Sequence, residues 1–327
     1  MYQIETVDLT RKFGDITAVD NLNLSIGEGE VFGLLGPNGA GKSTTLNMLC
    51  TILKPTSGTA TINGLDVDRH PDKVRQIIGI VFQDPSHDNR LTGRENLEMH
   101  AELYNVDREL ARERINELLT LVELDDRADE IMKNYSGGMR RRLEIARGLI
   151  HHPKVLFLDE PTIGLDPQTR AKIWDYIKRL SAEEDITIIL TTHYMDEAEL
   201  LCDRVGIIDH GKIVGLGTPK ELIKEIGEDV ATLQLEDNSM AKDFESAEFV
   251  KKVTVGEKVI MVLEDGPSSI PKIFEFAAAR KIKILSIELH TPTLNDVFLH
   301  RVGRELREEH GDGKDNIRRR MRMRGMR

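Results

Sequence analysis

The segment "GPNGAGKST", Gly36–Thr44, is the most informative part of this chain. It follows the apolar run "EVFGLL" at residues 30–35 and precedes an apolar helical pattern. Its three glycines can adopt backbone angles that other residues avoid, so successive N–H groups can wrap around an anion. A strand, a glycine-rich loop and a helix in this order match the motif G-x-x-x-x-G-K-[ST]. The sequence therefore predicts a phosphate-binding loop between a buried strand and a helix.

The same motif assigns tasks to two side chains of the loop. Lys42 is expected to reach the β- and γ-phosphates of a nucleotide, and the Ser43 hydroxyl to bind Mg²⁺. The residues predicted to bind the nucleotide are Gly36, Pro37, Asn38, Gly39, Ala40, Gly41, Lys42, Ser43 and Thr44.

A second segment, "VLFLDEP" at Val155–Pro161, places two adjacent carboxylates after a short apolar run. Ligands of parallel α/β sheets bind at the carboxyl ends of the strands, where both carboxylates are expected to lie. Because neighbouring strand residues point in different directions, the two carboxylates are expected to differ in their tasks. Asp159 is suited to the Mg²⁺ shell, and Glu160 to orienting or deprotonating an attacking water.

Two further polar side chains follow apolar runs. Gln83, in "IVFQDP", closes one run and is predicted to contact both Mg²⁺ and the water. His193, in "IILTTHYMDEA", is predicted to hold the γ-phosphate, although a histidine taken singly is more often a helix cap or a surface residue. The candidate catalytic residues are thus Glu160, His193 and Gln83, and the candidate metal ligands are Ser43, Gln83 and Asp159.

A third segment, "KNYSGGMRRRLEIARGL" at Lys133–Leu149, reads as a helix from Met139 onward. Its start is unusual, because glycine is a poor helix former and two glycines stand there. Free N–H groups at the positive end of a helix dipole form an anion site. The sequence predicts that Ser136-Gly137-Gly138 forms such a site.

Composition limits the class of protein. The 327 residues are 39% hydrophobic and carry a formal net charge of −11. The last fourteen residues carry seven basic groups and one acidic group, so the rest is near −17, which argues against broad nucleic-acid binding. We expect residues 304–327 to form a charged, disordered tail. We expect no membrane span, no signal peptide, and reduced core thiols at Cys50 and Cys202.

Apolar patterning predicts two units. Residues 1–227 read as a strand–helix–strand core that begins with antiparallel strands and has a helical insertion at about residues 84–150. Residues 228–303 follow the order strand, helix, strand, strand, helix, strand, which matches the split βαβ, ferredoxin-like motif. A helix opened by Thr293 and Asp296 is expected to close this small unit.

The order of these motifs resembles a known family. Over about residues 2–225 the chain closely resembles the ATP-binding subunit of an ABC transporter. The resemblance implies an α/β P-loop NTPase fold: a mixed sheet core, an antiparallel β subdomain and a helical subdomain, with the small C-terminal α+β domain added. It also implies an ATPase that requires ATP and Mg²⁺. Such an enzyme hydrolyses ATP to ADP and phosphate, and the hydrolysis drives transport.

In that family the Ser-Gly-Gly segment binds the γ-phosphate of ATP held by the opposing subunit. The resemblance therefore implies a head-to-tail homodimer in which Ser136, Gly137 and Gly138 act in trans. By the same likeness, Asp166 in "GLDP" would lie at the dimer seam. Phe13 matches the aromatic residue that stacks on adenine, although it also fits an ordinary half-buried strand position.

Finer features narrow the likeness. The segments "DNRLTGRENLEMHAELY", "PTIGLDP" and "TPTLNDVFLH" look like drug-exporter ATPases of the daunorubicin-resistance type. This implies multidrug export but does not fix the cargo, because similar chains are associated with drugs, sodium, lipids and polysaccharides. The family usually places Leu before the signature Ser, where this chain has Tyr135. A tyrosine fits there if its hydroxyl finds a partner.

Two functions remain to be compared. The favoured one is a cytoplasmic ATPase subunit, held at the inner face of the cell membrane by a separate multi-span permease. The alternative is a soluble ABC-type ATPase that acts on nucleic acid or ribosomes. A single cassette, no sustained heptad pattern and an acidic body disfavour the alternative, and only the basic tail supports it. A non-enzymatic binding module would require Glu160 to have no catalytic role.

Overall fold

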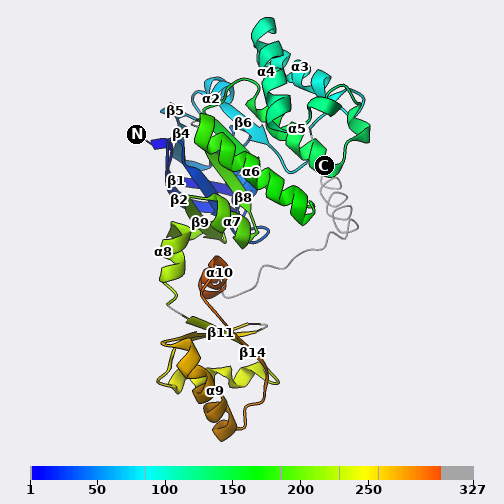
Figure 1. The fold of residues 1–327 in the computed structure, drawn as a ribbon. Coiled ribbons are helices and arrows are strands. Elements are labelled where there is room, and N and C mark those ends of the chain that lie inside the picture. The colour runs from blue at the N-terminus through cyan, green and yellow to red at the C-terminus, as the bar shows by residue number, and fades with distance from the viewer. Residues whose placement is uncertain (1, 85, 185, 228, 257, 303–327) are drawn as a thin grey trace, which may run out of the picture.

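The computed structural model describes residues 2–84, 86–184, 186–227, 229–256 and 258–302 (Figure 1). The expected tail and the expected boundary position at residue 228 lie outside the described residues. None of the described helices has the length and apolar composition that crossing a bilayer requires.

A six-stranded sheet forms the centre of the molecule, in the order β10-β9-β3-β8-β7-β6. Neighbouring strands are parallel except for β10, which pairs antiparallel with β9. Every residue of β3, β7 and β8 is buried, as expected for strands covered on both faces. The strands are β3 (Val31–Leu35), β6 (Ile78–Val81), β7 (Val155–Asp159), β8 (Thr187–Thr192), β9 (Arg204–Asp209) and β10 (Lys212–Gly217).

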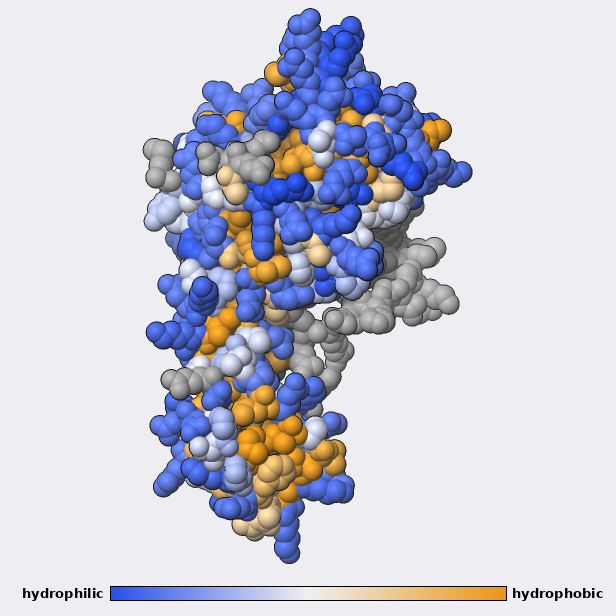
Figure 2. All heavy atoms as spheres, viewed as in Figure 1, coloured by the Kyte–Doolittle hydropathy of each residue, from blue (hydrophilic) through white to orange (hydrophobic). Residues whose placement is uncertain are grey.

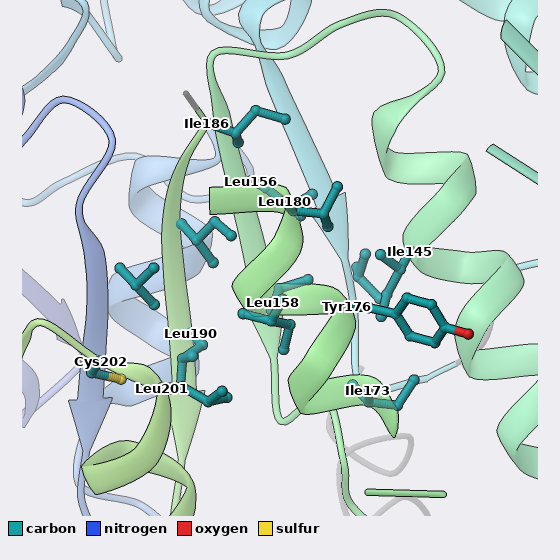
Figure 3. Packing of buried hydrophobic residues seen from close by; sticks show 14 of the residues in the cluster. Ile145, Leu156, Leu158, Ile173, Tyr176, Leu180, Ile186, Leu190, Leu201 and Cys202 are labelled. Atoms are coloured by element: carbon teal, nitrogen blue, oxygen red, sulfur yellow. The ribbon is translucent and has the colours of Figure 1, made fainter. Parts of the chain in front are cut away.

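Two hydrophobic cores cover the two faces of this sheet. In β7, Val155 and Phe157 belong to one core, whereas Leu156 and Leu158 belong to the other, as the alternation of strand side chains requires. Figure 3 shows the second of these cores, where β7 and β8 pack against α5 and α6. The flanking helices are α1 (Lys42–Leu49), α2 (Pro71–Ile77), α5 (Gly137–Leu149), α6 (Pro167–Glu184) and α7 (Met195–Leu201).

An antiparallel sheet packs beside the central sheet, in the order β2-β1-β4-β5. Its buried residues, among them Ile4, Leu22 and Ile62, share a core with α1 and with one face of the central sheet. This confirms the half-buried antiparallel strands that the alternating pattern predicts. The strands are β1 (Tyr2–Phe13), β2 (Ile16–Gly27), β4 (Ser57–Ile62) and β5 (Leu65–Asp66).

A group of helices lies between β6 and β7, as the sequence predicts. The first begins with a capping box, in which Thr92 accepts from the Glu95 N–H and Glu95 accepts from the Thr92 N–H. The elements are α3 (Gly93–Leu103), α4 (Arg108–Leu121), η1 (Asp125–Arg127), η2 (Met132–Asn134) and the start of α5. In Figure 1 they form the end of the molecule opposite to the C-terminal sheet.

The C-terminal unit, residues 229–290, contains an antiparallel sheet in the order β12-β13-β11-β14. This is the split βαβ arrangement expected from the sequence, with a 3-10 helix in place of the first α-helix. The elements are β11 (Asp229–Leu235), η3 (Asn238–Ser246), β12 (Val250–Val255), β13 (Val259–Leu263), α9 (Gly266–Arg280) and β14 (Ile284–His290).

Two helices connect this unit with the rest of the chain, namely α8 (Pro219–Lys224) and α10 (Leu294–Val302). The sequence predicts that α10 closes the small unit. In the structure, Phe298 of α10 shares a core with Val262 of the C-terminal sheet and also with Leu222 of α8 and Leu201 of α7. Thus α10 lies between the C-terminal sheet and the larger unit and packs against both (Figure 1).

Candidate active site

The phosphate loop is shaped by its glycines. Gly41 caps α1 with φ +114°, and Gly39 has φ +81°, both outside the region that side chains favour. A Cβ at Gly36 would lie 2.3 Å from the Ile208 carbonyl oxygen, and one at Gly41 would lie 2.5 Å from the Ala18 carbonyl oxygen. Glycine is therefore required at both positions, and the loop follows β3 and precedes α1 as predicted.

Lys42 is folded back into this loop. Its Nζ donates to the Gly36 carbonyl at 2.6 Å and lies 3.4 Å from a carboxylate oxygen of Glu160. Burial lowers the pKa of Lys42, and the nearby Glu160 carboxylate opposes this effect. The ammonium group thus lies between the loop carbonyls and the end of β7, where an anionic ligand would compete for its donors.

Oxygen ligands gather beside the loop. The Ser43 hydroxyl donates to Asp159 Oδ1 at 3.3 Å, and the Thr191 hydroxyl donates to the same oxygen at 2.5 Å. A hydroxyl and a carboxylate fit Mg²⁺, which usually takes one or two protein oxygens and fills its shell with phosphates and water. The described residues contain no group of three or more His, Cys, Asp or Glu able to hold a metal alone.

Glu160 has a left-handed backbone with φ +49°, a conformation that costs a non-glycine residue about 1–3 kcal/mol. Its N–H donates to Thr191, to the carbonyl at 3.2 Å and the hydroxyl at 3.1 Å. Nδ1 of His193 lies 2.5 Å from Glu160 Oε2. Burial would raise the pKa of Glu160, but His193 and Lys42 outweigh this effect and hold the pKa below its ordinary value. The side chain is therefore an anion at neutral pH.

Two predicted site residues are not brought into this group. Gln83 is exposed just beyond the end of β6 and forms no hydrogen bond with Lys42 or Asp159 in the part of the chain that the structure describes. Phe13 ends β1 with 44% of its surface exposed, and the Arg11 guanidinium lies 4.5 Å from its ring centroid. The ring is thus partly exposed and lies outside the core. Contacts of both residues with a nucleotide stay predictions.

The Ser-Gly-Gly segment forms the exposed N-terminus of α5. Ser136 is the N-cap, and its hydroxyl accepts from the Met139 N–H at 3.2 Å. The helix begins at Gly137 rather than at Met139, so both glycines lie in its first turn. A Cβ at Gly138 would lie 2.4 Å from Cγ2 of Thr169 on α6. Close packing between the two helices therefore explains why residue 138 is glycine.

Tyr135 fills its position with a partnered hydroxyl. The side chain is 2% exposed, and its hydroxyl donates to the Arg127 carbonyl at 2.7 Å. A Cβ at Gly93 would lie 2.3 Å from this hydroxyl oxygen, so a glycine there makes room for the larger ring. The structure therefore supplies the partner that the sequence argument required.

Asp166 lies directly before α6 and caps it. Its carboxylate accepts from the Thr169 N–H at 3.0 Å and from the Thr169 hydroxyl at 2.7 Å. Hydrogen bonds from Thr169 hold the pKa of Asp166 below its ordinary value. The residue is exposed, and its place at a dimer seam stays a prediction.

Sequence reasoning missed two polar groups behind the site. The Thr191 hydroxyl donates to Asp159 and accepts from the Glu160 N–H. Its position, as a polar residue near the end of an apolar strand, was the feature of the sequence that could have indicated this role. Glu197 of α7 is fully buried and accepts from Thr162 at 2.9 Å and from Trp174 at 3.0 Å. Burial raises the pKa of Glu197, and no local pattern indicated this contact.

Two family models match the chain. Residues 19–163 match the ABC transporter model, and residues 217–302 match the C-terminal domain described as ATP-binding protein DrrA1-3-like. The first match contains the phosphate loop and both carboxylates, and the second contains the C-terminal sheet.

Similar proteins cover nearly the whole chain. The daunorubicin/doxorubicin resistance ATP-binding protein DrrA of Streptomyces peucetius is 40% identical, over 92% of this chain and 92% of that protein. The linearmycin resistance ATP-binding protein LnrL of Bacillus subtilis is 37% identical, over 93% and 100%. The Nod factor export ATP-binding protein I of Ralstonia nicotianae is 39% identical, over 92% and 94%.

Solved structures agree with this likeness. The cbiO1 protein of Clostridium perfringens, part of an ABC transporter complex, aligns with a TM-score of 0.64 at 30% identity, over 76% of this chain and 96% of that one. A dimeric ATP-binding cassette bound to ADP and phosphate aligns with a TM-score of 0.59 at 32% identity, over 66% and 98%. The chain belongs to the family of ABC transporter ATP-binding proteins and is an ABC-type ATPase with a DrrA-like C-terminal domain.

Proposed function

We propose that this chain binds ATP on its phosphate loop, hydrolyses it with Glu160, and thereby powers export by a separate membrane protein. The observation that carries the proposal is the convergence of Lys42, Asp159, Glu160 and His193 at one edge of the central sheet. Ser43 and Asp159 meet there although 116 residues separate them in the sequence. The edge is formed by strand carboxyl ends, where ligands of α/β sheets bind.

The residues divide the work of phosphoryl transfer. Lys42 exchanges its loop carbonyls for phosphate oxygens, and Ser43 and Asp159 hold Mg²⁺, which neutralises phosphate charge when bound. The ionised Glu160 orients the attacking water and accepts its proton. His193, in contact with Glu160, is positioned to donate to a γ-phosphate oxygen from its other ring nitrogen. Gln83 is assigned to Mg²⁺ and the attacking water, as its place just beyond the end of β6 suggests.

A second copy of the chain completes the site in this proposal. The helix α5 presents Ser136 and two glycines at an exposed N-terminus, which suits a phosphate supplied from outside the chain. A similar cassette was solved as a dimer bound to ADP and phosphate, which supports the proposal that this chain dimerises. Asp166 and Phe13, both exposed, are assigned to the dimer seam and to the adenine, respectively.

The permease docks on the helical insertion and on the Gln83 loop. Exposed apolar side chains lie on α3 and α4, namely Met99, Leu103 and Leu110. They are available to an apolar partner and are connected through α5 to the Ser-Gly-Gly segment. The chain is then cytoplasmic and peripheral on the inner face of the membrane. The names of the relatives favour a drug or another amphipathic compound as cargo.

Transport in inverted membrane vesicles tests this function. A vesicle that contains this chain and a multi-span membrane protein that co-purifies with it is expected to accumulate daunorubicin when ATP and Mg²⁺ are added. The matched vesicle carries Glu160→Gln, which leaves the chain in place but removes the carboxylate. Equal accumulation by both would refute ATP-driven export of daunorubicin by this chain.

The nucleic-acid alternative makes the opposite prediction. If the alternative held, the ATPase rate of this chain would increase when RNA or ribosomes are added and would not increase when a permease is added. The acidic body of the chain opposes binding to a polyanion, so we expect no stimulation at physiological salt.

A further inference from the structure

One arginine of α5 forms hydrogen bonds with the backbone at the ends of two neighbouring strands beside the site. The Arg141 guanidinium donates to the Pro161 carbonyl at 2.7 Å and to the Phe82 carbonyl at 2.6 Å. It also donates to the carbonyls of Asp159 at 2.9 Å and Glu160 at 3.1 Å. All four acceptors are main-chain oxygens, and they follow or end two neighbouring strands, β6 and β7.

These bonds fall where the backbone needs support. Glu160 has a left-handed φ, which persists only if surrounding contacts hold it. Thr191 holds the Glu160 N–H from β8, and Arg141 holds the Glu160 carbonyl from α5. The peptide group before Glu160 is therefore held twice, by Thr191 at the Glu160 N–H and by Arg141 at the Asp159 carbonyl. The peptide group after Glu160 is held by Arg141 at the Glu160 carbonyl.

The second strand end reached by Arg141 leads into the Gln83 loop. The Phe82 carbonyl is the peptide oxygen immediately before Gln83. The same helix also holds this loop further along, because the Glu144 carboxylate accepts from the Ser86 N–H at 3.2 Å and lies 2.8 Å from His87 Nδ1. The segment around Gln83 and the helix α5 are thus joined at two points.

We propose that Arg141 is a positioning residue for hydrolysis. It holds Glu160 and the start of the Gln83 loop in register with the helix that carries Ser136. The planar guanidinium suits this task because its five donors are fixed in direction and can reach several carbonyls at once. The inference rests on the proposed function, because it assumes that Glu160 acts on the attacking water. Arg141 acts through the backbone in this proposal, because its hydrogen bonds go to main-chain carbonyls.

The next arginine of the same helix offers a matched control. Arg142 donates to the carbonyls of Val122 at 2.7 Å and Glu123 at 3.2 Å, away from the strand ends. The substitutions Arg141→Gln and Arg142→Gln remove the same chemical group one position apart. A general weakening of α5 would affect both variants alike, whereas positioning of Glu160 is lost only in the first.

The first measurement compares kcat with ATP affinity. We expect Arg141→Gln to lower kcat by between about tenfold and about a hundredfold, the range for a small misplacement of a reacting group. ATP affinity, which depends on the phosphate loop, stays within about twofold because Arg141 does not contact the loop. Arg141→Lys, which keeps the charge and protects the fold, is expected to recover only part of kcat. Equal kcat values for the Arg141 and Arg142 variants would overturn the proposal.

Hydrogen exchange without nucleotide gives a second test that does not require ATPase activity. In Arg141→Gln, the Glu160 N–H and its neighbours are expected to lose protection, while in Arg142→Gln they keep it. Unchanged protection in both variants would overturn the inference even if the wild type hydrolyses ATP. A wild type without ATPase activity would instead refute the proposed function, and the exchange result would still decide whether Arg141 holds this backbone.

Discussion

At the scale of single residues, the site depends on charges that balance one another in a buried place. The Lys42 ammonium and the Glu160 carboxylate lie 3.4 Å apart, and both side chains are buried. Removing either charge alone leaves the other without its partner, which is costly where water has little access. Lys42 contacts the phosphate loop, whereas Glu160 follows β7 directly. Substitution of Lys42 should therefore impair ATP binding, and substitution of Glu160 should impair hydrolysis.

The first prediction concerns Glu160→Gln. The amide keeps the size of the side chain but cannot accept a proton, so we expect ATP hydrolysis to fall by about 10²- to 10⁴-fold. ATP should still bind and should accumulate a dimer, visible by size-exclusion chromatography with ATP and Mg²⁺. Lys42→Ala is the control, because it removes the phosphate contact and should prevent both binding and dimer formation. A strictly monomeric Glu160→Gln would contradict the dimer model.

At the scale of elements, the start of α5 is set by packing within the helical insertion. The Tyr135 ring occupies space that exists only because residue 93, at the start of α3, is glycine. The Tyr135 hydroxyl also donates to the carbonyl of Arg127, the last residue of η1. The unusual residue before Ser136 is thus compensated by a second position, 42 residues earlier in the sequence.

The second prediction is that Gly93 and Tyr135 are coupled. Gly93→Ala places a Cβ against the tyrosine hydroxyl and should reduce the free energy of unfolding by about 1–3 kcal/mol. In a Tyr135→Leu background the same substitution should have a smaller effect, because the obstructing hydroxyl is absent. Thermal unfolding of the four proteins of this cycle measures the coupling. Strictly additive shifts in Tm would contradict the packing argument.

At the scale of the whole molecule, α10 joins two units that each have a core of their own. The C-terminal sheet packs its inner face against η3 and α9, and its outer face against α10. The Arg301 guanidinium adds a hydrogen bond to the Val214 carbonyl of β10 at 2.7 Å. Figure 2 shows apolar side chains gathered on the visible face of the C-terminal unit. In the same unit, Leu285 of β14 is exposed.

The third prediction tests this junction. Phe298 is fully buried where α10 meets both units, so Phe298→Ala should cost about 3–5 kcal/mol and make the junction more sensitive to limited proteolysis. Leu285→Ala provides the matched control, because that side chain is 53% exposed in the same part of the chain. A change in Tm no larger than that of the control would show that α10 does not secure the two units.

The fourth prediction concerns two copies of the chain. Lys42→Ala removes the phosphate loop of one copy, and Ser136→Ala weakens the segment proposed to act on the other copy. A mixture of the two variants should recover ATPase activity, because one intact site forms in each heterodimer. Each variant alone supplies the baseline. No recovery on mixing would contradict the proposed arrangement in trans.

Many elements of this protein could be predicted from its sequence, because they depend on interactions between residues that are close together in the chain. The phosphate loop follows from glycines that reach positive φ, and the strands β3, β7 and β8 follow from short apolar runs. The order of elements along the C-terminal unit was also predictable, because each element has its own hydrophobic period, and that order matches the split βαβ motif. These features depend on residues close together in the chain.

Only the tertiary structure decided the contacts that join distant segments. Thr191 reaches Asp159 across 32 positions, Arg141 reaches the Phe82 carbonyl across 59, and Arg301 reaches Val214 across 87. No sequence period specifies which carbonyl a long side chain will reach, because that depends on how complete elements pack. The sequence determined which groups perform the chemistry, and packing determined how firmly the backbone holds them.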